Sequence, residues 1–357
     1  MIHAFTSAAP NYLGKVRALR ESLKKHCPEI TFHWLVADVR NGALLAELEV
    51  EEVDEVLFAD DLSCGQDSAW LFTHSIVELS TAIKPEAAMS LLCRDDCDLL
   101  LYLDPDIVVF SPLDDLVDEI RSGSLALTPH LLQPEQEMDG ILDHELSALR
   151  HGVFNLGFLG VNDCVEGREF LEWWRERCRS FCRADLASGL FTDQKWVDFA
   201  PVFFPGMTIL RNPRFNVAPW NINQRQLGGT FDEGFQLDGQ PLGFYHFTGF
   251  DSGAHRGVIG KYAANNKSAN MLIDWYERRT SDLTPAATIP WKLGSYSNGV
   301  PIAPEHRELY RMRADLQATF PDPFAVTTAR FCLLRWMQVT GPAEHPELFS
   351  REEESGV

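Results

Sequence analysis

Two aspartates, Asp104 and Asp106, stand where one apolar run ends and another begins, with residues 99–103 before them and residues 107–110 after them. Burying an unpaired carboxylate is strongly unfavourable, so two acids at the end of a buried strand need a compensating charge. Strand residues alternate between faces, which places both carboxylates on one side with Pro105 between them. This pair suits a hard divalent cation that also holds a diphosphate. The alternative is a surface turn with two solvated acids.

The elements expected around this pair alternate between strand and helix. Near-continuous apolar strands separated by helices indicate a mostly parallel sheet with helices on both faces, an α/β fold. Ligands of such sheets bind at the carboxyl ends of the strands, where Asp104 and Asp106 lie. The predicted strands span residues 2–5, 32–36, 125–128 and 154–161, and the predicted helices span 12–23, 70–82, 113–120, 166–182, 304–319 and 327–339.

The last third of the chain has a different character. Glycine pairs and an Asp-Gly step divide residues 224–245 into short alternating runs, which predict a small β-hairpin region. Proline-rich loops follow Thr280 and lead into the two final helical stretches. We therefore expect a catalytic domain over residues 1–265 and a C-terminal loop and helical extension over residues 266–357 that packs on it.

Composition excludes several functional classes. The net charge of −21 argues against non-specific nucleic-acid binding, although a metal could still supply positive charge for a phosphate-bearing substrate. The eight cysteines show no zinc-binding spacing. No stretch approaches the roughly 18 apolar residues that a membrane span needs, and the chain opens directly in a strand-like run. We expect a cytoplasmic protein.

Three later motifs accompany the aspartate pair. They are residues 154–161 (FNLGFLGV), 192–196 (TDQKW) and 245–250 (YHFTGF). In this order, on an α/β background, the chain resembles the GT-A glycosyltransferases, especially the retaining family 8 group and its bacterial polysaccharide-biosynthesis relatives. The resemblance covers roughly residues 1–260. It implies a GT-A fold, which is a Rossmann-like open sheet that binds a nucleotide-sugar.

The resemblance implies a metal site. Asp104 and Asp106 match the DxD motif that holds Mn²⁺ or Mg²⁺ against a nucleotide diphosphate, and His246 matches the histidine that completes the site. Imidazole nitrogen and carboxylate oxygens together suit Mn²⁺. Without the resemblance and the upstream aspartate pair, a histidine between Tyr245 and Phe247 is better explained as a core residue.

The resemblance also assigns residues around the donor. It implies that Asn155 lies beside the donor sugar and that Asp193 and Gln194 lie below the reacting carbon. Lys84 stands where the family often has a basic residue near the donor. Asp193 also fits a helix N-cap, which is compatible with that placement. The residues expected to hold the nucleotide are Phe5, Thr6, Ser7, Tyr12 and Asp38.

The chain departs from the family after Gly249. Members usually continue into Lys-Pro-Trp, whose lysine contacts the diphosphate, but here residues 250–252 are Phe-Asp-Ser. We expect Arg256 or Lys261 to take over that contact, because each carries a full positive charge.

The implied function is metal-dependent transfer of a hexose-type sugar, with retention of configuration, from a nucleotide diphosphate donor. The expected donor is a UDP-sugar and the expected acceptor is a glycan or a lipid-linked glycan. The acceptor site is expected from residues 212–223 and the C-terminal helices. Residues 329–337 mix basic and aromatic side chains, which fits docking on the catalytic domain or peripheral contact with the inner membrane face.

Two other functions fit parts of the chain. A haloacid-dehalogenase-type phosphatase would use Asp104 as nucleophile and Asp106 as acid and base, but that class opens its domain with this strand, and here about a hundred residues precede it. A non-catalytic glycan-binding protein with a transferase-like fold is disfavoured because Asp104, Asp106, Asp193 and His246 are all present.

Overall fold

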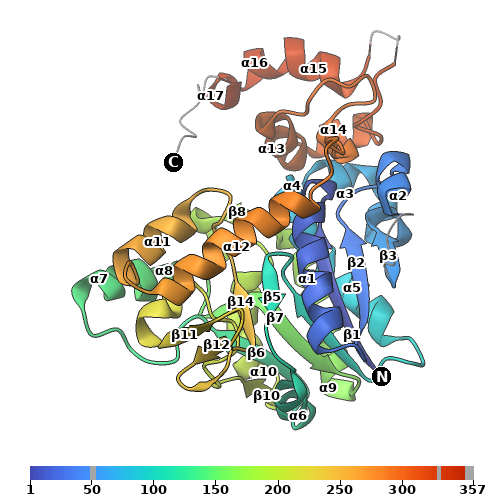
Figure 1. The fold of residues 1–357 in the computed structure, drawn as a ribbon. Helices are drawn as coiled ribbons and strands as arrows, with labels where there is room; N and C mark the ends of the chain where they lie inside the picture. The colour runs from blue at the N-terminus through green and yellow to red at the C-terminus, as the bar shows by residue number, and fades with distance from the viewer. Residues whose placement is uncertain (49–53, 328–330, 350–357) are drawn as a thin grey trace.

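The computed structural model describes residues 1–48, 54–327 and 331–349, and a seven-stranded sheet forms its centre (Figure 1). Strands β3, β2, β1 and β4 are parallel neighbours, β7 is antiparallel to β4 and β6, and β10 is parallel to β6. The expected mostly parallel α/β sheet is therefore confirmed. The strands are β10 (Met207–Ile209), β6 (Leu125–Pro129), β7 (Phe154–Asn162), β4 (Leu99–Leu103), β1 (Ile2–Ala8), β2 (Thr31–Val36) and β3 (Glu55–Phe58), in spatial order.

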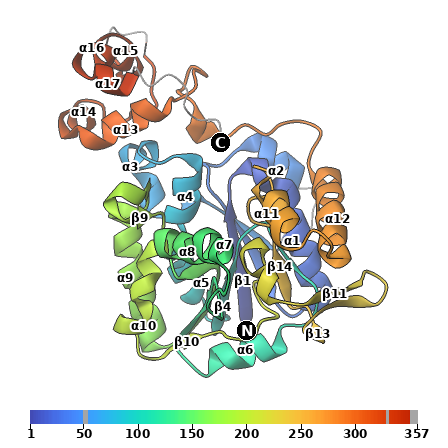
Figure 2. The ribbon, with the colours of Figure 1, turned by 90° about the vertical axis from the view of Figure 1, so that its left-hand side faces the viewer.

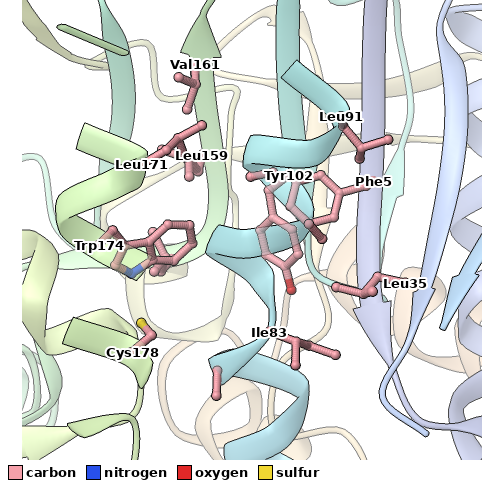
Figure 3. Close-up of a cluster of buried hydrophobic side chains, with 14 of the residues drawn as sticks. Phe5, Leu35, Ile83, Leu91, Tyr102, Leu159, Val161, Leu171, Trp174 and Cys178 are labelled. Atoms are coloured by element: carbon pink, nitrogen blue, oxygen red, sulfur yellow. The ribbon is translucent and has the colours of Figure 1, made fainter. Parts of the chain in front are cut away.

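Helices cover both faces of the sheet, because the central strands are apolar on both sides. Along β4, Leu100 and Tyr102 join one buried cluster, whereas Leu99, Leu101 and Leu103 join the other. The first cluster is covered by α4 (Ile76–Ala82), α5 (Lys84–Leu92) and α9 (Val165–Phe181), whose Trp174 lies among its large side chains in Figure 3. The second is covered by α1 (Leu13–His26), α2 (Gly42–Leu48) and α6 (Asp114–Arg121).

Three predicted elements are each divided in the structure, and one of them is the helix expected over residues 304–319, which is two helices ending at Met312 and Thr319. The helix expected over residues 70–82 is two helices, α3 (Ser68–Phe72) and α4, because Ser75 caps α4 in a capping box with Glu78. The run around the aspartate pair forms β4 and then β5 (Ile107–Val109), which leaves the main sheet to pair with β14 (Phe244–His246).

The predicted hairpins at residues 224–245 are confirmed. They form an antiparallel sheet of β11 (Leu227–Thr230), β12 (Gly234–Leu237) and β13 (Gln240–Pro241). Two helices follow to which the sequence analysis assigned no element, α11 (Ala254–Tyr262) and α12 (Lys267–Leu283). Helix α12 packs against α1, as Figure 2 shows, and its buried side chains share an apolar cluster with the hairpin sheet.

A second group of helices lies beyond α3 and α4, as Figure 2 shows from the side. These helices are α13 (Pro304–Met312), α14 (Ala314–Thr319), α15 (Leu333–Val339), α16 (Gly341–Glu344) and α17 (Pro346–Phe349). Their apolar cluster includes Phe72 of α3, which attaches them to the rest of the fold. Residues 328–330 and 350–357 lie outside the described residues. The first range contains part of the predicted last helix and of the basic-aromatic run, and both ranges belong to the predicted C-terminal extension.

None of the helices in the described ranges combines the length and the apolar character that crossing a membrane requires.

Candidate metal and donor site

The turn that carries Asp104 and Asp106 is anchored on both sides by backbone bonds. The Asp104 N–H donates to the Gly157 carbonyl of β7 at 2.8 Å, and the Phe247 N–H donates to the Asp106 carbonyl at 2.8 Å. The two aspartate side chains are 27% and 16% exposed, respectively. Both carboxylates are therefore held at the carboxyl end of β4 with a limited opening to water.

His246 reaches the aspartates because β14 pairs with β5, opposite Ile107. Its Nε2 lies 3.0 Å from Asp106 Oδ1 and 3.7 Å from Asp104 Oδ2, and one ligand atom from each of the three residues lies within 4.8 Å of the others. Burial alone would lower the pKa of His246, but the Asp106 carboxylate outweighs it and raises that pKa. The same contact keeps the pKa of Asp106 low although burial opposes it.

Asn216 fixes the orientation of the His246 ring. Its side-chain NH₂ donates to Thr128 Oγ1 at 2.8 Å and to Asn155 Oδ1 at 2.9 Å. Its carbonyl oxygen is thereby left to accept from His246 Nδ1 at 3.2 Å. Nε2 then faces the two carboxylates, as a metal ligand must. Asn216 holds this position with a φ of 50°, a left-handed conformation that non-glycine residues rarely adopt.

Gly157 leaves the room that the ring needs. A Cβ atom at this position would lie 2.4 Å from His246 Cε1 and 2.7 Å from Asn155 Oδ1, both far inside van der Waals contact. The glycine of the FNLG sequence is therefore required for the approach of His246 to β7. One nitrogen and two carboxylate ligands, with an oriented imidazole, fit a divalent cation such as Mn²⁺ or Mg²⁺.

Lys84 and Asp193 form a buried ion pair behind the aspartate turn. Lys84 Nζ lies 3.2 Å from Asp193 Oδ2 and 3.5 Å from Asp104 Oδ1, over the ring of Tyr102, whose hydroxyl also donates to Asp104. Burial alone would lower the pKa of Lys84, but the two carboxylates raise it. Burial, with Asp104 nearby, raises the pKa of Asp193. Thr192, just before Asp193, has a φ of 46°, so the backbone is strained at this point.

Asn155 and Gln194 are joined to the metal cluster by hydrogen bonds. Asn155 donates to Gln194 Oε1 at 3.3 Å, and its NH₂ lies 3.3 Å from His130 Nε2. Gln194 also accepts from the Leu156 N–H at 2.9 Å and donates to the His151 carbonyl at 3.1 Å. The expected donor-site residues Asn155, Asp193 and Gln194 are thus brought together beside His246.

A cleft of about 300 Å³ opens in front of the aspartates. Five of the expected residues line it, namely Ser7, Tyr12, Lys84, Asp104 and Asp106. The rest of its wall comes from the end of β1 and the turn after it, from α4 and from Pro105. The metal cluster therefore borders a hollow between the first strand and α4.

The other expected nucleotide-binding residues lie elsewhere. Phe5 and Thr6 are buried within β1 and do not line this cleft. Asp38 is also buried, and its carboxylate accepts from the Lys292 and Leu293 N–H groups at 2.9 and 3.2 Å. Burial raises the pKa of Asp38 to about 6. Asp38 thus holds the segment before α13 in place.

The two cations expected at the diphosphate are also outside this cleft. Arg256 pairs with Asp274 and Glu277 of α12, at 3.1 and 2.6 Å. Lys261 pairs with Asp139 and Asp143, at 3.4 and 2.7 Å. Both lie on α11, which the sequence analysis did not assign, and both face exposed acids.

Sequence reasoning missed several residues of the site. Asn216 falls in the stretch expected to bind the acceptor, and its role depends on a contact 30 residues away. His130 has no motif around it, and burial lowers its pKa to about 4. Lys15 carried no signal beyond its place on an amphipathic helix.

Two similar proteins come from Bacillus subtilis (strain 168). The uncharacterized protein YfnD is 28% identical over 254 residues, which are 70% of this chain and 78% of YfnD. The uncharacterized protein YfnF is 27% identical over 258 residues, which are 69% of this chain and 82% of YfnF. No family model matches the chain.

Solved structures with a similar course of the chain are glycosyltransferases. The galactosyltransferase LgtC, in complex with donor and acceptor sugar analogs, has a TM-score of 0.44 and 19% identity, over 81% of this chain and 98% of LgtC. Mouse xyloside xylosyltransferase 1, in its apo form, has a TM-score of 0.41 and 15% identity, over 70% and 97%. Similarity at this level does not identify a function, which depends on the residues of this chain's own site.

Proposed function

We propose that this protein is a metal-dependent glycosyltransferase that moves a sugar from a nucleotide diphosphate donor to a glycan or lipid-linked acceptor, with retention of configuration. One observation carries the proposal. Asp104, Asp106 and His246 converge at the edge of a cleft at the carboxyl ends of the strands. The buried pair Lys84 and Asp193 lies directly behind them. We propose a UDP-sugar as the donor.

Asp104, Asp106 and His246 would hold the divalent cation, which when bound supplies positive charge to the departing diphosphate. Tyr102 and Lys84 hold the Asp104 carboxylate, and Asn216 holds the His246 ring. The ligands are thus oriented before the substrate arrives. This arrangement favours electrostatic stabilisation of the leaving group, because preorganised charges cost no reorganisation during the reaction.

The buried ion pair bears on the stereochemistry. Asp193 is 2% exposed, with one carboxylate oxygen next to Lys84 and the other accepting from Thr192 Oγ1 at 3.2 Å. A carboxylate engaged in this way is a poor nucleophile. It supports a role in which Asp193 positions Lys84 and stabilises positive charge at the sugar. We propose that no covalent sugar–enzyme intermediate forms and that a diphosphate oxygen takes the acceptor proton.

Trp220 is the best-placed side chain for an acceptor glycan. Asn216 and Asn221, from the same stretch, are buried and engaged in internal hydrogen bonds. Trp220 is partly exposed and stands edge-on to His246 and His130, with ring centroids 5.4 and 5.1 Å away. An indole suits the apolar face of a sugar ring.

The test is nucleotide release from a panel of UDP-, GDP-, ADP- and CDP-sugars with Mn²⁺. We expect slow hydrolysis of one donor, which chelation of the metal abolishes. Asp106→Asn should remove this activity, whereas Asp118→Asn, which changes an exposed aspartate of α6, should not. If neither turnover nor metal-dependent nucleotide binding is found with any donor of the panel, the proposal is wrong.

The phosphatase alternative keeps one supporting observation, which is Lys84 beside the Asp104 carboxylate at 3.5 Å. Against it, Asp106, which would have to act as acid and base, is engaged by His246. Hydrolysis of p-nitrophenyl phosphate that is lost in Asp104→Asn would favour this alternative. We expect no such hydrolysis.

A further inference from the structure

Lys15 of α1 is held beside the cleft by Asp251 and Tyr12. Its side chain is only 11% exposed, and its Nζ lies 2.6 Å from Asp251 Oδ2 and 4.1 Å from the centre of the Tyr12 ring. The Tyr12 hydroxyl donates to the same Asp251 oxygen at 2.8 Å. Since Tyr12 lines the cleft, Lys15 is held at its edge by a residue of the cleft wall.

Lys15 lies near the metal cluster through Tyr12, because Tyr12 and the turn of Asp104 and Asp106 line the same cleft. Lys84, also in the cleft wall, approaches the turn from the side of Asp193, whereas Lys15 lies on the side of Tyr12. The cleft therefore has one lysine in its wall and a second at its edge.

A balance of charges shows why the second lysine matters. Asp104, Asp106 and Asp193 carry three negative charges, which Lys84 and a divalent cation cancel. The two negative charges of a sugar-nucleotide diphosphate would then lie in a partly buried site without a counter-charge. Such a charge is costly unless a cation pairs with it. Arg256 and Lys261 neither line the cleft nor pair with a residue of its wall.

Asp251 can give up Lys15 at little cost. Its side chain is 57% exposed, so water can solvate the carboxylate when the lysine leaves. It lies in the turn after His246, between Gly249 and Gly253, whose φ angles are 70° and 78°.

We propose that Lys15 binds the diphosphate of the donor and that Asp251 holds Lys15 at the cleft edge until the donor arrives. The inference rests on the proposed function and assigns one of its substrate contacts. In the free protein, Lys15 is paired with Asp251. On binding, the donor phosphates take the place of that carboxylate, and Lys15 adds a positive charge opposite the one from Lys84.

The test is calorimetric titration of UDP in the presence of Mn²⁺, with GDP, ADP and CDP as further probes. Lys15→Met should weaken binding about 10- to 100-fold, the range of one lost charge-assisted hydrogen bond. Lys15→Arg should keep affinity within about tenfold, because the charge remains. Lys25→Met, which removes an exposed lysine from the same helix, is the matched control and should bind as the wild type does.

Asp251→Asn separates a substrate contact from a structural one. If Lys15 serves the donor, removing the competing carboxylate should leave UDP binding as tight or make it a few-fold tighter. If Lys15 and Asp251 only brace the fold, both variants should weaken binding, and that result overturns the inference. Equal binding by Lys15→Met and Lys25→Met overturns it too and leaves the proposed function intact. Absence of binding of every nucleotide to the wild type overturns both.

Discussion

At the carboxyl ends of the strands, His246 faces Asp104 and Asp106, whereas at the amino ends His3 and His33 face each other. His3 Nδ1 lies 2.9 Å from His33 Nε2, and the two rings stack with centroids 5.0 Å apart. Both clusters combine buried imidazole with nearby carboxylates. They differ in the cationic side chains that pair with those carboxylates.

At the amino ends, Arg94 pairs with both acids. It lies 2.7 Å from Glu55 and 3.2 Å from Asp96, so the two carboxylates share one arginine. Burial then lowers the pKa of His33 to about 4, although Glu55 opposes this. The histidines there are neutral at pH 7 and structural.

At the carboxyl ends, Asp104 and Asp106 have no arginine partner among the residues that the structure describes. The carboxylates instead raise the pKa of His246. The two clusters thus differ in the cation beside their carboxylates, which is Arg94 at the amino ends and Lys84, next to Asp104, at the carboxyl ends.

The largest effect is expected from Gly157→Ala. The new Cβ would displace the His246 ring, so Mn²⁺-dependent turnover should fall about 10²- to 10³-fold, as when a preorganised group is removed. Gly160→Ala on the same strand is the control, because its Cβ would meet only the side chain of Ile120. It should lower stability and leave metal binding unchanged. Similar loss of metal affinity in both variants would contradict the role of Gly157.

A smaller effect is expected from Asn216→Gly, which removes the amide but accepts the left-handed backbone. Mn²⁺ affinity should fall about 10- to 100-fold, as is usual when the partner of a metal-ligating histidine is lost. Asn221→Gly, at a buried asparagine that does not contact His246, should keep metal affinity within a few-fold. A titration of both variants decides whether Asn216 orients the ring.

The smallest effect is expected from the cluster of His3 and His33 at the amino ends of the strands, and it is an effect on stability alone. Because the pKa of His33 is about 4 in the folded protein against 6.5 in a model peptide, its contribution to stability is present above pH 6.5 and is lost as pH falls toward 4. His3, Glu55 and Arg94 face this ring. The unfolding free energy drops between pH 7 and pH 5, and this drop should be smaller in His33→Gln than in the wild type by about 2 kcal/mol.

Urea denaturation at each pH measures this drop. An unchanged pH dependence would show that His33 is not the buried base we describe. Mn²⁺-dependent turnover at pH 7 should be unaffected, because the cluster lies at the other end of the sheet.

The sequence was enough to predict a mostly parallel sheet and the three residues, Asp104, Asp106 and His246, that the structure brings close enough to hold a metal. Asp104 and Asp106 interrupt an apolar run, and His246 belongs to a motif with a fixed order, so both signals are local. The partners of these ligands could not be predicted. Asn216 meets His246 across 30 residues, and Lys15 meets Asp251 across 236, contacts that depend on how β14, the loop after it and α1 pack.

Contacts between distant segments also explain why Asp38, Arg256 and Lys261 lie away from the cleft at which they were expected. An aspartate at a strand end predicts a ligand contact, yet Asp38 accepts backbone N–H groups from a segment more than 250 residues away. The charges on α11 were expected at the diphosphate because they follow His246. The structure pairs them with acids of α12 and of residues 139–143 instead.

The most direct test of the account is a titration of Mn²⁺ followed by electron paramagnetic resonance, with and without UDP. We predict one bound ion in the wild type and in Asp118→Asn, held at least about tenfold more tightly with UDP, since linkage makes the two ligands strengthen each other. Asp106→Asn should lose both the site and the effect of UDP. Equal Mn²⁺ binding by Asp106→Asn and the wild type would contradict the central claim that Asp104, Asp106 and His246 hold the metal against the nucleotide.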